Sequence, residues 1–339
     1  MEEYRDKVAR CRELAERDPE AYLPDLAKGL AALATRLVEV EGESDEAYQA
    51  AQEAADIYRE LAKRDPDTFL TPLAEWLVEL ADLQGWDWGN DETREVMLEL
   101  VELSPNLTVE DHGLELQILA TQLTGLADEL LSMDRPDDAL KVALGDVRIN
   151  SRVAEHHSAH RLALKGSFHD AIDILGEIDK AEKVLQPARE LVEISRKWSE
   201  REPENFLPYL AASLETVGYC LAELERLRET FEPMREAVDI RRKLAERHPG
   251  EGNLPLAASI MMLAYLYVKT GDPESAIETC TEGLQAIAHT LPSPTASAEV
   301  YAKALVNIYR KACEKAGREP EEALVRPIVE VLERSLREE

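Results

Sequence analysis

The sequence predicts an all-α solenoid, a row of antiparallel helix pairs, and three observations support this fold class. Hydrophobic residues make up 45% of the 339-residue chain, enough for a core, whereas aromatic residues make up only 5%. Ala, Leu and Glu dominate, and these residues lose little conformational entropy on entering a helix. A proline-centred segment recurs along the chain, and between its copies apolar residues follow at intervals of three and four, the spacing of an amphipathic helix.

The repeat is clearest in four segments: AERDPEAYLPDLAKGL, AKRDPDTFLTPLAEWL, SEREPENFLPYLAASL and AERHPGEGNLPLAASI. Their first prolines are Pro19, Pro66, Pro203 and Pro249, so the spacings are 47, 137 and 46 residues. Because 137 is close to three such repeats, two divergent copies are expected in between. One is predicted around residues 119–130, where leucines and alanines repeat the pattern of the first copy.

Each repeat proline follows a charged helix end and is expected to begin the next helix, where its missing N–H costs nothing. The repeating unit is therefore a helix, a short turn, a second helix and a proline. A single continuous domain is expected, because no Gly/Ser- or Pro-rich linker divides the chain. We expect a lone N-terminal half-repeat over 1–18 and helix pairs over 19–65, 66–105, 106–157, 158–202, 203–248, 249–291 and 292–339.

The unit LAASIMMLAYLYVKTGDPESAIETCTEGL resembles the tetratricopeptide repeat (TPR) family in its alternation of large and small packing residues. Those positions are Ile260, Leu263, Ala264, Tyr267, Gly271, Asp272, Ala276, Cys280 and Gly283. The long unit with its LPxLAxxL opening is similar to the bacterial, kinesin-light-chain-like branch. The resemblance implies a right-handed superhelix of about seven helix pairs, whose first helices line a concave groove for protein partners. The groove Asn of that branch is replaced here by Ala32, Glu79, Thr216 and Met262, so its way of holding peptide backbone is not carried over.

Alignment of the repeats predicts which side chains face this groove. They are acidic in the middle of the chain and apolar or aromatic toward its C-terminal end. The predicted partner-binding residues are Glu75, Glu79, Asp82, Asp128, His169, Asp170, Asp173, Glu215, Tyr219, Met261, Met262 and Tyr265. Such a groove favours a Lys/Arg-rich protein or peptide with an apolar anchor. The competing interpretation is a solvated acidic face, since acids are common throughout this chain and charge runs are usually solvated.

The net charge of -30 excludes two classes of partner. A strongly negative field repels phosphate backbones and anionic lipid, so nucleic acid and membrane surfaces are not expected to bind. No apolar run reaches the roughly 20 residues that cross a bilayer. The charged start MEEYRDKVARCREL does not resemble a signal peptide, and the four cysteines form no CxxC pair. We therefore expect a cytoplasmic protein.

Two clusters were considered for chemistry or recognition. His156, His157 and His160 could hold a metal only on one continuous helix, and the repeat alignment predicts a helix break near His157. The stretch GWDWGND is the least helical in the chain, so Trp86 and Trp88 are either an exposed aromatic anchor or the cover of a shortened helix. There is no GxGxxG, GxxxxGK[ST], HExxH or GxSxG motif. No enzyme activity, metal or cofactor is expected.

Taken together, these observations predict a non-enzymatic scaffold or adaptor that holds a basic protein or peptide segment in an acidic groove. The alternative is a ligand- or peptide-sensing regulatory module of a bacterial signalling or defence system. A homodimer formed through a terminal helix is also left open, because the lone first helix is half of a pair.

Overall fold

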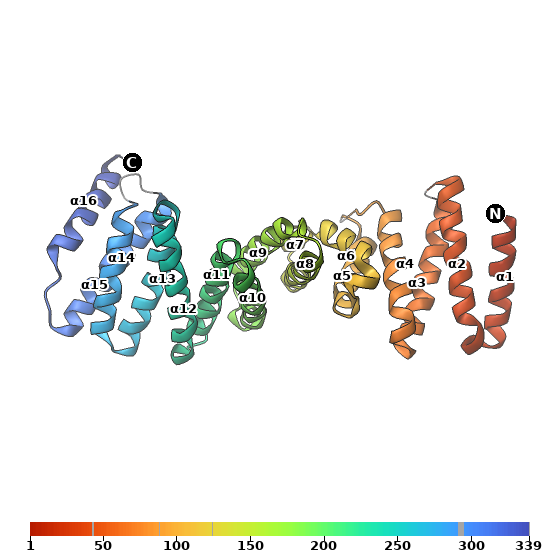
Figure 1. The fold of residues 1–339 in the computed structure, drawn as a ribbon, viewed down its shortest axis with the longest axis horizontal. Coiled ribbons are helices and arrows are strands. Elements are labelled where there is room, and N and C mark those ends of the chain that lie inside the picture. The colour runs from red at the N-terminus through yellow and green to blue at the C-terminus, as the bar shows by residue number, and fades with distance from the viewer. Residues whose placement is uncertain (43, 88, 124, 291–294, 339) are drawn as a thin grey trace. The chain divides into compact units, whose positions relative to one another are not determined.

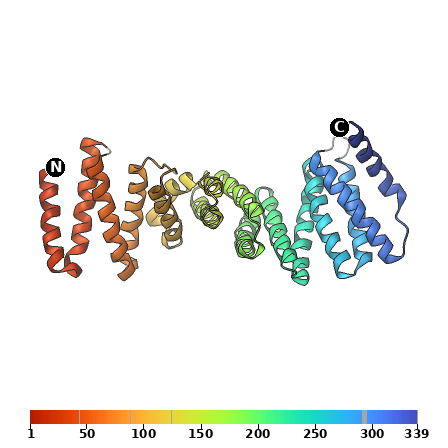
Figure 2. The same ribbon diagram turned by 180° about the vertical axis from the view of Figure 1, so that it is seen from behind.

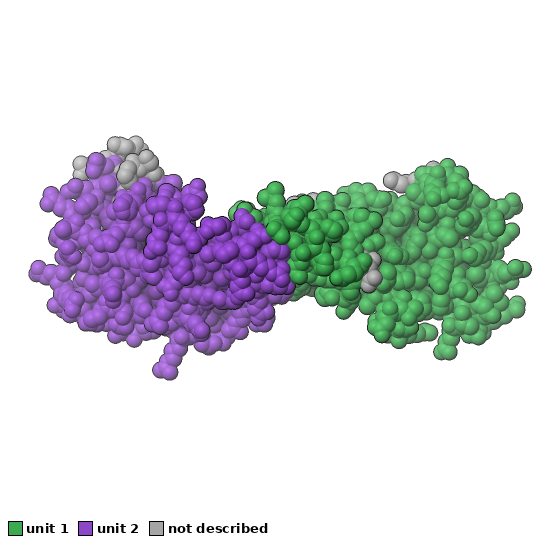
Figure 3. Space-filling model, viewed as in Figure 1, with its two compact units in different colours: residues 1–174 green, residues 175–339 purple. Residues whose placement is uncertain are grey.

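The computed structural model describes residues 1–42, 44–87, 89–123, 125–290 and 295–338. Within these residues the chain is all-α, and successive helices pack as antiparallel pairs in a repeat solenoid, as the sequence predicts (Figure 1). The chain divides into two compact units, Met1–Ile174 and Leu175–Glu339 (Figure 3). Each unit is described below by itself.

Unit 1 contains the helices up to most of α9. Its elements are α1 (Glu2–Arg17), α2 (Pro19–Glu41), α3 (Asp45–Arg64), α4 (Pro66–Leu83), α5 (Asp91–Leu103), the 3-10 turn η1 (Ser104–Asn106), α6 (Val109–Leu123), α7 (Leu126–Ser132), α8 (Pro136–His156) and α9 (His160–Glu177). Helix α1 packs against α2, and α2 against α3, so each helix covers the apolar side of the next.

Unit 2 continues the same pattern with longer, more regular helices. They are α10 (Ala181–Arg201), α11 (Pro203–Glu223), α12 (Leu227–Arg247), α13 (Pro249–Thr270), α14 (Pro273–Ala288), α15 (Ala296–Ala316) and α16 (Glu322–Glu338). Each of α10 to α15 packs against the next helix of the series, and α13 also contacts α15 directly (Figures 1 and 2).

The repeat prolines begin helices, which confirms that part of the sequence prediction. Helices α2, α4, α11 and α13 all start at their repeat proline. Before α2 and α4, an aspartate side chain caps the helix: Asp18 accepts a hydrogen bond from the Ala21 N–H at 3.2 Å, and Asp65 from the Thr68 N–H at 3.3 Å. Such caps satisfy backbone donors that the first turn leaves unpaired.

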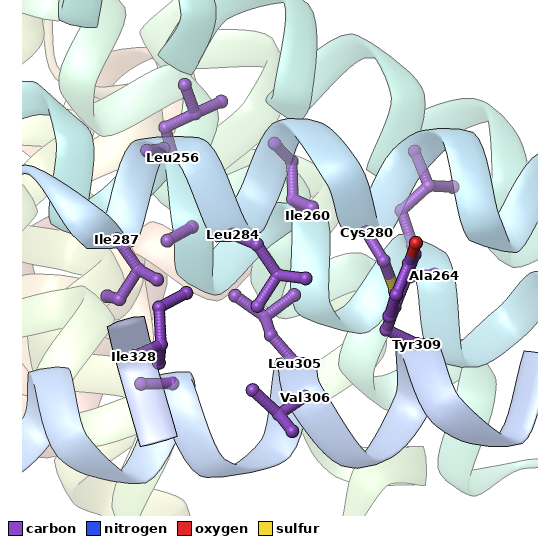
Figure 4. Close-up of a cluster of buried hydrophobic side chains, with 14 of the residues drawn as sticks. Leu256, Ile260, Ala264, Cys280, Leu284, Ile287, Leu305, Val306, Tyr309 and Ile328 are labelled. Atoms are coloured by element: carbon purple, nitrogen blue, oxygen red, sulfur yellow. The ribbon is translucent and has the colours of Figure 1, made fainter. Parts of the chain in front are cut away.

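One core cluster of unit 2 is centred on α13, α14 and α15 and extends to α12 and α16 (Figure 4). Ile260 and Ala264 of α13 meet Cys280 and Leu284 of α14, and all four are fully buried. These are packing positions that the TPR resemblance assigns, or their neighbours. The small side chains allow the helices to approach closely, and the large ones fill the space between them.

The third repeat departs from the prediction. The leucine pattern of residues 119–130 predicts one continuous helix, but α6 ends at Leu123 and α7 begins at Leu126. Gly125 lies between them with a φ of 84°, in the left-handed region that glycine adopts without steric cost. Apolar spacing alone did not reveal this break, because the leucines on either side of it, Leu119, Leu123, Leu126 and Leu130, are all buried.

Ion pairs link the second helices of successive repeats, and we call this set the ion-pair ladder. Its pairs are Arg12–Glu53, Arg59–Glu99, Arg196–Glu236 and Arg242–Glu282. The last of these has an N–O distance of 2.7 Å. All four arginines occupy one position of the repeat and all four glutamates another, so the ladder follows directly from the periodicity.

Candidate partner-binding surfaces

The first acidic surface lies on α7 and α9 of unit 1. Asp128, His169 and Asp173 are exposed, and Asp170 is half-buried. His169 Nε2 lies 3.6 Å from Asp173 Oδ2, one helical turn along α9. Burial raises the pKa of Asp170, and the nearby Asp128 and Asp173 carboxylates raise it further, whereas His169 lowers it. The fold therefore does bring Asp128 and Asp170 together, from different helices.

The second acidic surface lies on α4. Glu75 and Asp82 are exposed and Glu79 is half-buried. Burial raises the pKa of Glu79, and the carboxylate of Asp82 adds to this effect. An ionised acid is disfavoured when water is partly excluded and a like charge lies near. A cationic side chain placed against this face would favour the ionised form of Glu79.

Trp86 is a neighbour of this surface rather than a freely exposed anchor. Its indole Nε1 donates a hydrogen bond to Asp82 Oδ1 at 3.0 Å, and its side chain is partly buried. Its φ of 53° is unusual for a residue with a side chain, so the turn that follows α4 holds it in the left-handed region. Trp88, the other predicted aromatic anchor, lies outside the described residues.

In unit 2, the predicted acid Glu215 already has partners within the chain. Arg241 of α12 donates two hydrogen bonds to its carboxylate, at 2.9 and 3.0 Å, and the hydroxyl of Ser259 of α13 donates a third. The two charged side chains are only 18% and 13% exposed. Glu215 thus ties α11 to α12 and α13.

The predicted apolar and aromatic residues of unit 2 form a partly exposed face. Tyr219 of α11 and Tyr265 of α13 are 39% and 41% exposed, which is high for residues of their size in a folded helix pair. Met261 and Met262 are half-buried. Burial raises the pKa of Tyr219 to about 12, with contributions from Glu215 and Tyr301. Tyr301 of α15 therefore lies near Tyr219.

Acidic residues are distributed unevenly, both among the helices and between the two units. Helices α4, α6 and α7 contain nine Asp and Glu residues and no Lys or Arg. Unit 1 as a whole contains 39 acidic and 17 basic residues, and unit 2 contains 30 and 22. The excess of negative charge is thus concentrated in unit 1, where the two acidic surfaces lie.

The histidines near the end of α8 and the start of α9 lie at a helix boundary. Helix α8 ends at His156 and α9 begins at His160, which confirms the predicted break. The rings of His157 and His160 are 6.4 Å apart, and His156 lies 3.9 Å from Glu110. In the part of the chain that the structure describes, no three His, Cys, Asp or Glu side chains could hold a metal ion. None of its helices is both long enough and apolar enough to cross a membrane.

Comparisons with known proteins give similarity of fold only. No protein-family model and no curated protein matches the chain. Among solved structures, BtubC (BKLC) from P. vanneervenii is 17% identical with a TM-score of 0.39, over 73% of this chain and 92% of that one. The TPR domain of P58(IPK) is 15% identical with a TM-score of 0.19, over 98% of both chains. A circular tandem repeat protein is 18% identical with a TM-score of 0.31, over 97% of this chain and 88% of that one.

Several residues of these surfaces were not identified from the sequence. Arg241 lies on the second helix of its pair, whereas the groove is predicted from the first helices. Tyr301 lies in the last pair, where the repeat pattern is weak. A further set, Asp146 and Asn150, interrupts the apolar segment ALKVALGDVRINSRVA at a spacing of four. That spacing places both polar groups on one face of α8, and it is the sequence feature from which the pair could have been predicted.

Proposed function

We propose that the chain is a non-enzymatic adaptor that binds a basic protein or peptide segment through the acidic surfaces of unit 1. The observation that carries this proposal is the charge sorting of the helices: α4, α6 and α7 hold nine acids without a Lys or Arg. Repeat scaffolds of paired helices typically bind proteins through an extended surface. A cationic segment would gain from attraction to many carboxylates at once.

The carboxylates at these surfaces are arranged to favour a cation. The pKa values of Asp170 and Glu79 are raised by burial and by neighbouring acids, so each surface holds a carboxylate whose charge is incompletely compensated. A lysine or arginine side chain brought beside them adds the missing opposite charge. The tyrosine face of unit 2, with Tyr219 and Tyr265, offers a separate contact for apolar residues of a partner.

The test is an affinity pull-down from cell extract with two variants that have the same net charge. One carries Asp128→Lys and Asp173→Lys, and the other carries Asp6→Lys and Glu13→Lys on the exposed side of α1. We expect a basic partner to be retained by the wild type and by the α1 variant, and to be lost from the first variant. Retention should also fall as salt rises, because exposed charges are screened over about 8–10 Å at physiological salt.

Equal loss from both variants would mean that net charge alone attracts the partner, without a defined surface. Equal retention by both would remove the α7–α9 surface from the proposal. In that case the tyrosine face becomes the binding surface to test, with Tyr219→Ala and Tyr265→Ala.

A further inference from the structure

A buried polar cluster joins α8 to α9 within unit 1. Asp146 and Asn150 stand one turn apart on α8 and are 6% and 2% exposed. The Asn150 amide donates to Asp146 Oδ1 at 2.7 Å and to the hydroxyl oxygen of Ser167, on α9, at 3.0 Å. The Ser167 hydroxyl donates to the Ala163 carbonyl at 3.1 Å and also lies within hydrogen-bonding reach of the Asp146 carboxyl.

The carboxyl group of Asp146 and the side-chain oxygen of Asn150 are buried without the partners that such groups normally have. A buried carboxylate normally has a cationic partner, but the groups that act on Asp146 are the neutral Ser167 and Asn150 and the acidic Asp170. Burial, the largest effect, raises its pKa to about 7. In addition, the buried side-chain oxygen Oδ1 of Asn150 has no hydrogen-bond partner among the described residues. An unpartnered buried oxygen costs free energy comparable to a lost hydrogen bond.

The cluster has two hydrogen-bonding arrangements that differ by one proton. When Asp146 is ionised, it accepts from the Asn150 amide, and Oδ1 of Asn150 stays unpaired. When Asp146 is protonated, a half-turn of the Asn150 amide lets the carboxyl O–H donate to that oxygen. An aspartic acid can donate only in its protonated form, so the proton selects between the two arrangements.

The cluster is electrostatically coupled to the acidic surface of α9. Asp170 follows Ser167 by one helical turn, and its carboxylate raises the pKa of Asp146. The pKa of Asp170 is in turn affected by Asp128 of α7 and, on its own helix, by His169 and Asp173. Among the described charged groups, Asp170 therefore affects the pKa of Asp146, and Asp128, His169 and Asp173 affect the pKa of Asp170.

We propose that loss of one proton from the Asp146–Asn150–Ser167 cluster switches the α7–α9 surface from weak to strong binding of a cationic side chain. The switch rests on the proposed function, since the α7–α9 surface is its site. Ionised Asp146 adds a second negative charge behind Asp170. A cation held by Asp128 and Asp170 stabilises that charge, so partner binding and proton release favour each other.

The proton switch can be tested without any partner, through the pH dependence of stability. A carboxyl with a raised native pKa makes the folded state bind its proton more tightly than the unfolded chain, whose pKa is about 3.9. The melting temperature of the wild type, relative to Asp146→Asn, should therefore fall as pH rises from about 4 to about 7 and stay constant above. Asp137→Asn, at the exposed start of α8, is the matched control and should not show this fall, because an acid in the first turn of a helix is favoured in its ionised form.

Two further variants should move the pH at which the fall ends, in opposite directions. Ser167→Ala removes a hydrogen bond that favours the ionised carboxyl, so the end of the fall should move to higher pH. Asp170→Asn removes the neighbouring charge, so it should move to lower pH. A merely structural role would change the melting temperature at every pH without moving this point. These variants also keep the test decisive should Asp146→Asn fail to fold.

Binding is then measured with a capped hexalysine peptide as the probe. A unit charge added about 8–10 Å from a bound cation, at an effective dielectric constant of about 20–60, predicts roughly two- to thirtyfold tighter binding when Asp146 is ionised than when it is protonated, so the affinity should rise between pH 6 and pH 8. Asp146→Asn should remove this gain, and Asp137→Asn should keep it.

The outcomes separate the two proposals. A pH-independent difference in melting temperature between the wild type and Asp146→Asn would overturn the switch, whatever the peptide does. The switch would also be overturned if the stability measurements show that Asp146 titrates but Asp146→Asn binds the peptide with the same pH dependence as the wild type. In either of these two outcomes, the proposed function would still be supported if the double variant Asp128→Lys and Asp173→Lys loses the basic partner.

Discussion

Gly283 of α14 offers a direct test of how the helices of unit 2 pack. A methyl group added there, as in Gly283→Ala, would lie 2.6 Å from Cγ2 of Ile260 on α13. It would also lie 3.0 and 3.3 Å from the two δ carbons of Leu305 on α15. Both neighbours are fully buried in the core of Figure 4, and the side chain of Ile260 is branched at Cβ. Neither can yield easily, because a β-branched side chain is stiff and the core is closely packed.

Two opposing effects set the magnitude. Overpacking a core by one methyl group costs about 1–3 kcal/mol, and replacing Gly by Ala inside a helix gains about 0.5–1 kcal/mol. Gly29→Ala on α2 is the control, because its methyl group would lie 3.6 Å from Val8, an ordinary contact. The control keeps the helix gain without the clash. We therefore expect Gly29→Ala to raise stability and Gly283→Ala to lie about 1–3 kcal/mol below it.

The assay is thermal and urea unfolding of the two variants and the wild type, followed by circular dichroism. For a unit of this size, 1 kcal/mol shifts the melting temperature by about 2–4 °C. If Gly283→Ala melts as high as Gly29→Ala, then α13, α14 and α15 do not meet at this residue. The large and small packing positions assigned through the TPR resemblance would then be in the wrong register.

Three other predictions follow from the charged residues. A double-mutant cycle on Arg242 and Glu282 should give a coupling of about 0.3–1 kcal/mol that falls with salt, because this ladder pair is partly exposed; a coupling near zero at low salt would contradict it. Glu215→Ala should cost about 2–3 kcal/mol in urea unfolding, since it leaves the largely buried Arg241 without its carboxylate. Glu79→Gln should become more stable relative to the wild type as pH rises through 4.5 and above, because the raised pKa of Glu79 makes the native wild type lose stability as this acid ionises. The same difference in melting temperature between variant and wild type at pH 4 and at pH 7 would refute this.

The periodic features of the fold could be predicted from the sequence, because they depend on local physical rules. Pro19, Pro66, Pro203 and Pro249 begin helices, since proline cannot donate an intrahelical hydrogen bond and fits the first turn. Apolar spacing then identified the helix pairs. The break at Gly125 was not predicted, because the spacing of leucines on either side continues unchanged.

The contacts between side chains of different helices were beyond the sequence argument. Nothing in the alignment showed that Arg241 would reach Glu215, or that Asp128 of α7 would approach Asp170 of α9. Such contacts depend on how far one helix is rotated against the next, and the apolar pattern leaves that rotation open by a residue or more. The sequence therefore named the acids, but their neighbours within the chain became visible only in three dimensions.

Charge sorting helps to decide between a binding surface and a simply solvated acidic face. On a solvated face, acids and bases are expected to mix, since mixed charges repel least. Here the arginines of the ion-pair ladder lie on the second helices, where each neutralises a glutamate of the next repeat. The first helices α4, α6 and α7 carry acids without Lys or Arg. Burial raises the pKa values of Glu79 and Asp170, and a neighbouring acid adds to the effect in each case, Asp82 beside Glu79 and Asp128 beside Asp170. The adaptor that we propose would account for this arrangement, because a basic partner would place an opposite charge beside carboxylates that otherwise repel each other.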